Sequence, residues 1–333
     1  MDIDWLSDES HVLLNPRMPA DERARLESFV TDLQGHLWLA TSGTTGALKL
    51  TALSKQAMLA SAAAVNRHLQ SDASDVWLCV LPKFHVGGLG IYARAFISGA
   101  RVVTTGWEAV TLASLVPAQV SDLVRAGTRA PASLRAVVIG GGALASSLYS
   151  EARALGWPLL PSYGMTECCS QVATATAQSP ELLLLDHMEA RVEEDGRLSL
   201  RSAALFTGYA TAEGFIDPRV DGWFTTEDVA SIDGGVLRVE GRRGDFVKIG
   251  GESVDLSRLD RILAELGADA AAVAIPDERL GHVIALAIAG DDGSVVDAFN
   301  TRVFPFERAR RVIRVAEIPR TPLGKIIRNR IAW

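Results

Sequence analysis

The sequence predicts an α/β protein: a large N-terminal domain with buried mixed or parallel sheets, helices and a small strand-rich part, followed by a small α+β C-terminal domain. Three observations lead to this prediction. Over the first two-thirds of the chain, short apolar runs are each followed by a loop and a helical pattern, which is typical of strands buried on both faces. After about Leu182 the runs shorten and alternate in polarity between Asp-Gly turns. The chain also has 333 residues, more than one hydrophobic core usually serves.

Three apolar runs in the N-terminal part are predicted strands: residues 37–41, 76–81 and 136–139. Helices are predicted after the first and third of them, at about residues 55–69 and 144–155. Ser54 is a suitable N-cap for the first helix, and Pro82 ends the second strand. Because ligands of such sheets bind at the loops after the carboxyl ends of strands, we expect a site at these loops.

The C-terminal part carries shorter elements. Strands of alternating polarity are predicted at residues 196–200 and 235–239. The polar, glycine-punctuated segment 241–245 is the candidate interdomain linker. Beyond it, we expect helices and strands in an α+β arrangement: helices at residues 257–266 and 295–301, strands at residues 270–275 and 282–289.

Composition and charge exclude several classes. Lys plus Arg total 33 against 40 Asp plus Glu, a net charge of -7, which argues against a broad nucleic-acid surface but permits a local basic pocket for an anion. The three cysteines cannot form a disulfide framework, so we expect buried thiols in a reducing cytosol. The acidic first 16 residues do not form a secretory signal, and no apolar run reaches the ~20 residues that cross a bilayer. We therefore expect a soluble, cytoplasmic protein without membrane insertion.

The segment from Thr41 to Lys49, TSGTTGALK, is the strongest local signal. Its two glycines let the backbone turn N–H groups inward, hydroxyls flank them and a lysine follows, which suits phosphate oxygens. It is not a Walker A loop, which has four residues between its glycines and ends in Gly-Lys-Ser/Thr. The alternative is an ordinary Ser/Thr/Gly surface loop.

Four weaker segments follow. Beside a glycine, Tyr163 can stack on a flat ring, and Thr166 with Glu167 can hold a hydrated magnesium ion against phosphates. Asp228, after a predicted strand, can accept both hydroxyls of a ribose, although a solvated turn acid is the alternative. The last two segments are Gly241-Arg242 and residues 319–325, where a glycine turn delivers Lys325 near the C-terminus.

In this order, the five segments resemble those of the adenylate-forming superfamily, which includes acyl-CoA synthetases, luciferases and the adenylation domains of peptide synthetases. The resemblance runs from about Leu37 to Lys325. Within the superfamily, residues 82–89 (PKFHVGGL) with Arg94, and residues 162–171 with their Cys-Ser-Gln ending, are most similar to the short form of the o-succinylbenzoate–CoA ligase family of menaquinone biosynthesis.

The resemblance implies residue roles toward ATP, Mg²⁺, an acid and coenzyme A. The β- and γ-phosphates would be held by Thr41, Ser42, Gly43, Thr44, Thr45, Gly46 and Lys49. The adenine slot would be formed by Gly140, Gly141, Gly142, Tyr163 and Gly164, with Asp228 and Arg242 on the ribose and Thr166 and Glu167 serving the phosphate and the metal. The acyl pocket would be built by His85, Gly88, Arg94, Ser170 and Gln171, with His85 displaced when coenzyme A enters; a histidine satisfied at a strand end is the alternative for His85.

The resemblance also implies a moving domain. Residues 1–241 would bind ATP and the acid, 242–246 would be a hinge linker, and 247–333 would be a mobile domain. This domain would present Lys325 to the carboxylate and α-phosphate in one orientation, and Gly250, Gly251 and Glu252 for the coenzyme A step in the other.

The chain departs from the family pattern at several places. Leu48 and Leu50 stand where Pro and Gly are usual, Glu227 replaces the Gly of Thr-Gly-Asp, and Gly244 occupies the hinge position usually held by Asp or Lys. Little more than thirty residues precede the phosphate loop, so we expect part of a pocket wall to be missing or to come from a partner subunit, which keeps a homodimer open.

The implied function is an AMP-forming acid–thiol ligase that activates o-succinylbenzoate as acyl-AMP, releases pyrophosphate and then forms the CoA thioester. Two alternatives stay open: a ligase for another acid or for a carrier-protein thiol, and a nucleotide-binding relative without turnover. Intact Lys325, Glu167 and Asp228 argue against the last of these, because a non-catalytic protein has no chemical need for them.

Overall fold

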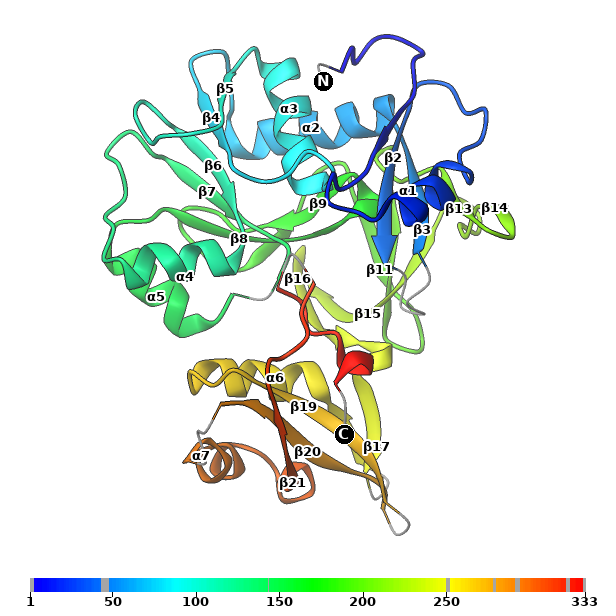
Figure 1. Cartoon of the computed structure of the whole chain (residues 1–333). Coiled ribbons are helices and arrows are strands. Elements are labelled where there is room, and N and C mark those ends of the chain that lie inside the picture. The colour runs from blue at the N-terminus through cyan, green and yellow to red at the C-terminus, as the bar shows by residue number, and fades with distance from the viewer. Residues whose placement is uncertain are drawn as a thin grey trace.

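A computed structural model describes residues 3–42, 48–142, 144–249, 252–277, 280–290, 294–321 and 324–331. It has two lobes, a large one coloured blue to yellow and a small one coloured gold to red (Figure 1). The predicted fold class is confirmed. No helix in these ranges is both long and apolar enough to span a membrane.

The main sheet of the large lobe joins a parallel half to an antiparallel half. The parallel half runs in the order β5 (Arg101–Val103), β4 (Val76–Cys79), β6 (Leu112–Leu115), β7 (Ala136–Ile139) and β8 (Leu159–Met165). The antiparallel half continues from β8 with β9 (Ser170–Thr174), β10 (Leu182–Leu184), β16 (Val236–Arg242), β15 (Phe224–Asp233), β12 (Arg197–Arg201) and β11 (Glu189–Val192). The two halves therefore meet at β8, the strand that carries Tyr163.

Helices cover both faces of the parallel half. One face packs against α2 (Lys55–Leu69) and α3 (Val86–Ser98), the other against α4 (Pro117–Arg125) and α5 (Ser146–Ala154) (Figure 1). The strand residues are buried toward both sides, as in β7, where all four side chains are buried. Ser54 caps α2 as predicted, accepting a hydrogen bond from the backbone N–H of Ala57 at 3.1 Å.

A second sheet corrects the predicted loop between the first strand and α2. Its strands run β1 (His11–Leu13), β2 (His36–Ser42), β3 (Leu48–Ser54), β13 (Gly208–Thr211) and β14 (Gly214–Ile216), with α1 (Ala20–Glu27) nearby. The chain turns back after β2 and pairs antiparallel as β3 before α2 begins. The hairpin forms because Leu50 and Ala52 fill the core while Lys49 and Thr51 alternate to the other face. Leu50, one of the departures from the family pattern, is thus a fully buried core residue.

The small lobe has its own apolar core. Its elements are η2 (Arg243–Asp245), β17 (Phe246–Ile249), β18 (Glu252–Asp255), α6 (Leu256–Glu265), β19 (Ala270–Asp277), β20 (Gly281–Ala289), α7 (Ser294–Arg302), η3 (Pro305–Glu307), β21 (Ala309–Val315) and η4 (Arg328–Arg330). Leu259, Leu263 and Phe299 pack against the sheet β19-β20-β21. The red C-terminal segment then returns toward β16, at the junction of the lobes (Figure 1). The boundaries of the mobile domain stay a prediction.

The three cysteines are free and buried, as predicted: Cys79, Cys168 and Cys169.

Candidate active site

A buried carboxylate forms the centre of the predicted nucleotide site. Asp228 on β15 lies directly opposite Arg242 on β16 in the antiparallel register, and its Oδ1 accepts a hydrogen bond from Arg242 Nε at 2.7 Å. Its Oδ2 accepts a hydrogen bond from the hydroxyl of Tyr163 at 2.5 Å. Burial and the neighbouring charge of Asp228 raise the pKa of Tyr163, so the phenol stays a donor. Three residues predicted from three separate segments therefore meet here.

The alternation of β15 explains why Glu227 is tolerated before Asp228. Asp228 points inward and is buried, whereas the side chain before it, Glu227, points outward and lies 3.4 Å from Arg197. The residue that replaces glycine is a solvated surface acid.

The glycines after β7 lie beside this corner. Gly140 follows β7, the parallel neighbour of β8, and an added Cβ there would lie 3.4 Å from Ser162 Oγ, next to Tyr163. Gly141 has φ +78°, a conformation that favours glycine. Gly164 is required for packing, because a Cβ would lie 1.9 Å from the carbonyl oxygen of Ser170. Gly140 and Gly164 therefore lie close to Tyr163, and their role in an adenine slot stays a prediction.

Tyr209 connects the predicted phosphate-binding and metal-binding segments. Tyr209 on β13 donates a hydrogen bond to Glu167 Oε1 at 2.7 Å, and the ammonium of Lys49 on β3 lies 3.2 Å from the centroid of the Tyr209 ring. Burial lowers the pKa of Lys49 and the charge of Glu167 raises it. Sequence reasoning missed Tyr209, because only the pairing of β13 with β3 brings it to the site.

The ends of the phosphate loop are described, but its middle is not. Thr41 and Lys49 pair across β2 and β3, and the Thr41 hydroxyl lies 3.0 Å from that of Thr51. The predicted Gly43, Thr44, Thr45 and Gly46 lie outside the described residues, as does the side chain of Ser42.

A buried guanidinium occupies the predicted acyl region. Arg94 on α3 is 2% exposed, and its Nη2 donates a hydrogen bond to Ser170 Oγ on β9 at 3.0 Å. Its Nε and Nη1 have no partner among the described residues, nor does the side-chain nitrogen of Gln171. Burial lowers the pKa of Arg94 to about 10, which still leaves it charged at neutral pH. Unpaired buried donors of this kind call for an acceptor.

The backbone around these groups is specialised. Cys169 and Ser170 have φ 53° and 126°, unusual values that store strain and set the Ser170 hydroxyl against Arg94. Gly88, at the start of α3, cannot carry a side chain, because a Cβ would lie 2.3 Å from the carbonyl oxygen of Pro82. His85 is the N-cap residue of α3; its Nε2 is buried without a described partner, and burial lowers its pKa.

The C-terminal segment that carries Lys325 returns from the small lobe toward β16 (Figure 1). Lys325 follows Gly324, whose φ is +82°, and its backbone N–H donates a hydrogen bond to Thr321 Oγ1 at 3.1 Å. Desolvation and the positive charge of Arg242 lower the pKa of Lys325, while Asp228 raises it. The side chain keeps contact with solvent, but these electrostatic effects put its ammonium in the field of the Asp228–Arg242 pair.

The predicted metal site, as far as its residues are described, offers oxygen donors and no preformed cage. In the described part of the chain, no three His, Cys, Asp or Glu side chains are grouped to hold an ion. Thr166 and Glu167, in η1, supply a hydroxyl and a carboxylate, which suit magnesium when it is shared with substrate phosphates.

The AMP-binding enzyme family model matches residues 37–210, which include the phosphate-loop, Tyr163 and Tyr209 segments just described. The chain belongs to this family.

Individual members of the AMP-binding family agree with the predicted resemblance. The chain is 29% identical to a 2-succinylbenzoate–CoA ligase of Staphylococcus epidermidis over 87% of this chain and 68% of the relative. Among solved structures, o-succinylbenzoate CoA synthetase of Bacillus subtilis with the acyl-adenylate intermediate OSB-AMP has a TM-score of 0.81 at 26% identity, covering 89% of this chain and 69% of that one. The same enzyme with ATP and magnesium ion has a TM-score of 0.80 at the same identity and coverage. The chain thus spans about two-thirds of the length of these AMP-binding enzymes.

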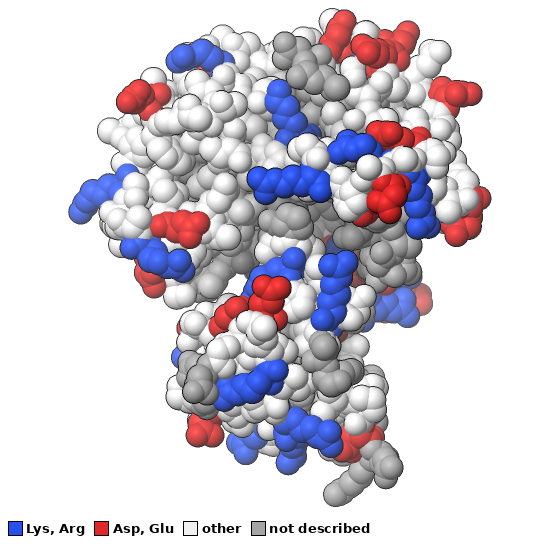
Figure 2. Space-filling model, viewed as in Figure 1, with Lys and Arg blue, Asp and Glu red and all other residues white. Residues whose placement is uncertain are grey.

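Ion pairs on either side of Gly244 mark where the two lobes of this AMP-binding enzyme are joined. Before it, Arg242 binds Asp228 and Arg243 lies 3.1 Å from Asp195. The two acids, Asp228 and Asp195, belong to the large lobe. After it, Asp245 binds Arg328 at 2.7 Å within the small lobe. Figure 2 shows Lys and Arg side chains gathered at this junction. For the predicted coenzyme A step, Gly250, Gly251 and the side chain of Glu252 lie outside the described residues.

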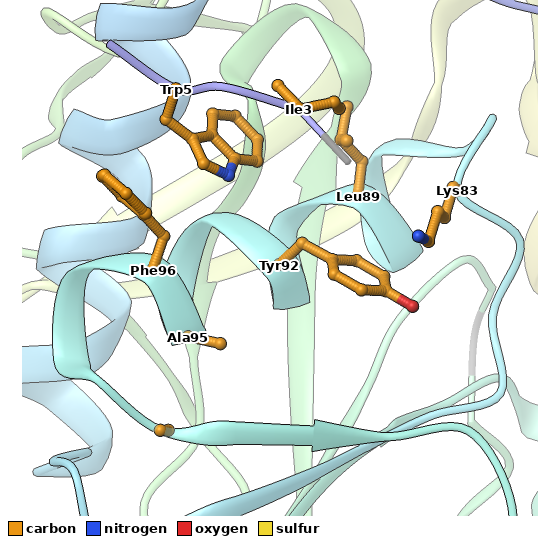
Figure 3. A pocket seen from close by; sticks show the side chains of 8 residues that line it. Ile3, Trp5, Lys83, Leu89, Tyr92, Ala95 and Phe96 are labelled. Carbon is orange, nitrogen blue, oxygen red and sulfur yellow. The ribbon is translucent and has the colours of Figure 1, made fainter. Parts of the chain in front are cut away.

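A separate slot of about 270 Å³ lies on the outer face of α3 (Figure 3). Trp5 and Ile3 of the N-terminal segment face Leu89, Tyr92 and Lys83 across it. None of the predicted site residues lines this slot.

Proposed function

We propose that this chain is an AMP-forming acid–CoA ligase whose acid is o-succinylbenzoate. The observation that carries the choice of acid is the buried Arg94 with two guanidinium nitrogens, Nε and Nη1, that have no hydrogen-bond partner among the described residues. o-Succinylbenzoate has two carboxylates, and activation of the succinyl one leaves an aromatic carboxylate that needs a cationic host. Arginine suits this function because its planar fork matches a carboxylate. The relatives named above support the same substrate.

The reaction answers a chemical problem, because a carboxylate is a poor acyl donor. In the first half-reaction, a succinyl carboxylate oxygen attacks the α-phosphorus of ATP and pyrophosphate leaves. In the second, the thiolate of coenzyme A attacks the acyl carbon and AMP leaves. Lys325 stabilises negative charge at the α-phosphate and the carboxylate in the first step.

The large lobe holds the nucleotide. Tyr163 stacks beside the base, and the Asp228 oxygens, already aligned by Tyr163 and Arg242, accept the ribose hydroxyls. Lys49 and the loop after Thr41 bind the outer phosphates. Glu167 and Thr166 would hold magnesium together with ATP, and the ion would neutralise phosphate charge.

The small lobe alternates between two orientations about Gly244. Residues 1–241, 242–246 and 247–333 form the substrate domain, the hinge and the mobile domain. One orientation would present Lys325 to the α-phosphate and the carboxylate for adenylation, and the influence of the Asp228 and Arg242 charges on the pKa of Lys325 supports it. Rotation would remove Lys325 and bring Glu252 with its loop to the acyl-adenylate for the thioester step. The homodimer and the cytoplasmic location remain predictions.

ATP–pyrophosphate exchange with a panel of carboxylic acids tests this function. We expect Mg²⁺-dependent exchange with o-succinylbenzoate and much slower exchange with benzoate and short fatty acids. Exchange with another acid only would favour a different ligase, and transfer to a carrier-protein thiol rather than coenzyme A would change the acceptor. ATP binding without exchange for any acid would indicate a nucleotide-binding protein without turnover.

A further inference from the structure

Tyr209 lies between two groups of opposite charge that both serve ATP. Its cross-strand partner on β3 is Thr51, and Lys49 lies two residues away on the same face of that strand. The Lys49 ammonium therefore lies diagonally across the strand pair, 3.2 Å from the ring centroid. On the other side, the phenol donates its hydrogen bond to Glu167 Oε1 at 2.7 Å.

The phenol stays neutral, so it separates the charges without adding one. A phenol that donates a hydrogen bond to Glu167 Oε1 is itself uncharged. The ammonium of Lys49 lies against the Tyr209 ring, while the charge of Glu167 acts on it. A direct Lys49–Glu167 ion pair would consume the cation needed by phosphate and the anion needed by the metal.

We propose that Tyr209 is a positioning residue that keeps Lys49 and Glu167 apart and available for magnesium and the ATP phosphates. Its hydroxyl holds one oxygen of Glu167 and leaves the other carboxylate oxygen for the metal. Its ring holds the ammonium of Lys49 through a contact weak enough for phosphate to displace. This inference rests on the proposed ATP- and Mg²⁺-dependent function.

Calorimetric titration of the full chain with ATP, with Mg²⁺ and with EDTA, tests the inference without any acid or turnover. Tyr209→Phe keeps the ring and removes only the bond to Glu167. We expect it to weaken ATP binding in Mg²⁺ on the order of 5- to 30-fold, the usual effect of losing a charge-assisted bond. Binding in EDTA should change less than about 2-fold. Tyr149→Phe, on α5 and packed against the apolar core on the α4 and α5 side of the sheet, is the matched control and should match the wild type in both buffers.

Two further comparisons decide whether the effect passes through Glu167. In a Glu167→Gln background, Tyr209→Phe should weaken ATP binding in Mg²⁺ by less than about 2-fold, because the carboxylate it positions is gone. Tyr209→Leu, which also removes the ring, should weaken binding in Mg²⁺ more than Tyr209→Phe does. Equal losses in Mg²⁺ and EDTA, or a full loss in the Gln background, would overturn the inference while leaving the function standing. If the wild-type chain binds no ATP in Mg²⁺, both the inference about Tyr209 and the proposed function are wrong.

Discussion

Replacing Arg94 with methionine should impair activity toward o-succinylbenzoate without lowering the free energy of unfolding. Burial lowers the pKa of Arg94 from 12.5 to about 10, so the charged form is disfavoured in the folded state. At 1.36 kcal/mol per pKa unit, the cost is roughly 3 kcal/mol at neutral pH, where arginine is charged in both states. The bond to Ser170 returns about 1–2 kcal/mol. Arg94→Met, similar in length and uncharged, should therefore leave the free energy of unfolding unchanged or raise it by up to about 2 kcal/mol.

The same change should impair activity toward one acid only. If Arg94 hosts the aromatic carboxylate, removing it should cost about 2–5 kcal/mol, as when one partner of a buried charge pair is truncated. That is a loss of roughly 30-fold to several thousand-fold in kcat/KM for o-succinylbenzoate. The acid 4-oxo-4-phenylbutanoate has the same activated end but lacks the aromatic carboxylate, so its kcat/KM should change by less than about 3-fold.

Urea unfolding and pyrophosphate exchange with both acids give the assay. Arg94→Lys is the control variant, because it keeps the positive charge but loses the planar guanidinium that can donate two parallel hydrogen bonds. Its activity toward o-succinylbenzoate should lie between that of Arg94→Met and that of the wild type. Equal losses for the two acids, together with a lower free energy of unfolding, would show that Arg94 is a structural residue and would weaken the choice of o-succinylbenzoate.

Three other predictions follow from the lobes and the core. Lys325→Ala should slow adenylation by at least about 100-fold but change thioester formation from presynthesised acyl-adenylate by less than about 3-fold. The control Arg330→Ala should leave both rates near those of the wild type. Equal losses in the two half-reactions would show that Lys325 has a structural role. Gly244→Pro fixes φ near −65° and should slow one half-reaction without changing the melting temperature. Gly244→Ala should slow each half-reaction less than Gly244→Pro does. If both half-reactions of Gly244→Pro run near the wild-type rate, Gly244 is not the hinge. Burial lowers the pKa of His187 from 6.5 to about 4, so the unfolded chain binds the proton first as pH falls, and about 2 kcal/mol of stability should be lost from pH 7 to pH 5. His187→Leu should abolish that difference in urea unfolding, and an undiminished pH dependence would contradict the assignment.

Local chemistry predicted the elements that depend on neighbours in the sequence. Residues 136–139 form a continuous apolar run and are a strand with the same bounds, and Ser54 caps α2 because its hydroxyl needs only the next turn. The predicted helix at residues 144–155 lies at Ser146–Ala154, within the usual uncertainty of helix ends.

The features that could not be predicted from the sequence depend on contacts between residues far apart in the chain. Residues 48–54 carry both apolar and polar side chains, and only pairing with β2 and β13 makes them a strand. Tyr209 has no motif of its own, and its contact with Glu167 spans 42 residues. Asp228 and Arg242, in contrast, were predicted through family motifs, and the structure adds the reason for their spacing, which is direct cross-strand register.

The bond between Arg328 and Asp245 has a consequence for the timing of catalysis. Arg328 lies three residues after Lys325 and also pairs with Asp260, so it fastens the lysine loop to the residue beside the pivot. In the proposed rotation about Gly244, Arg328 and the neighbouring Lys325 should therefore move together with the small lobe. The conformational entropy of ordering that loop is lost once, when the chain folds, and not again in every turnover. In the proposed mechanism, the rate at which Lys325 leaves and returns is then set by the rotation of the small lobe about Gly244.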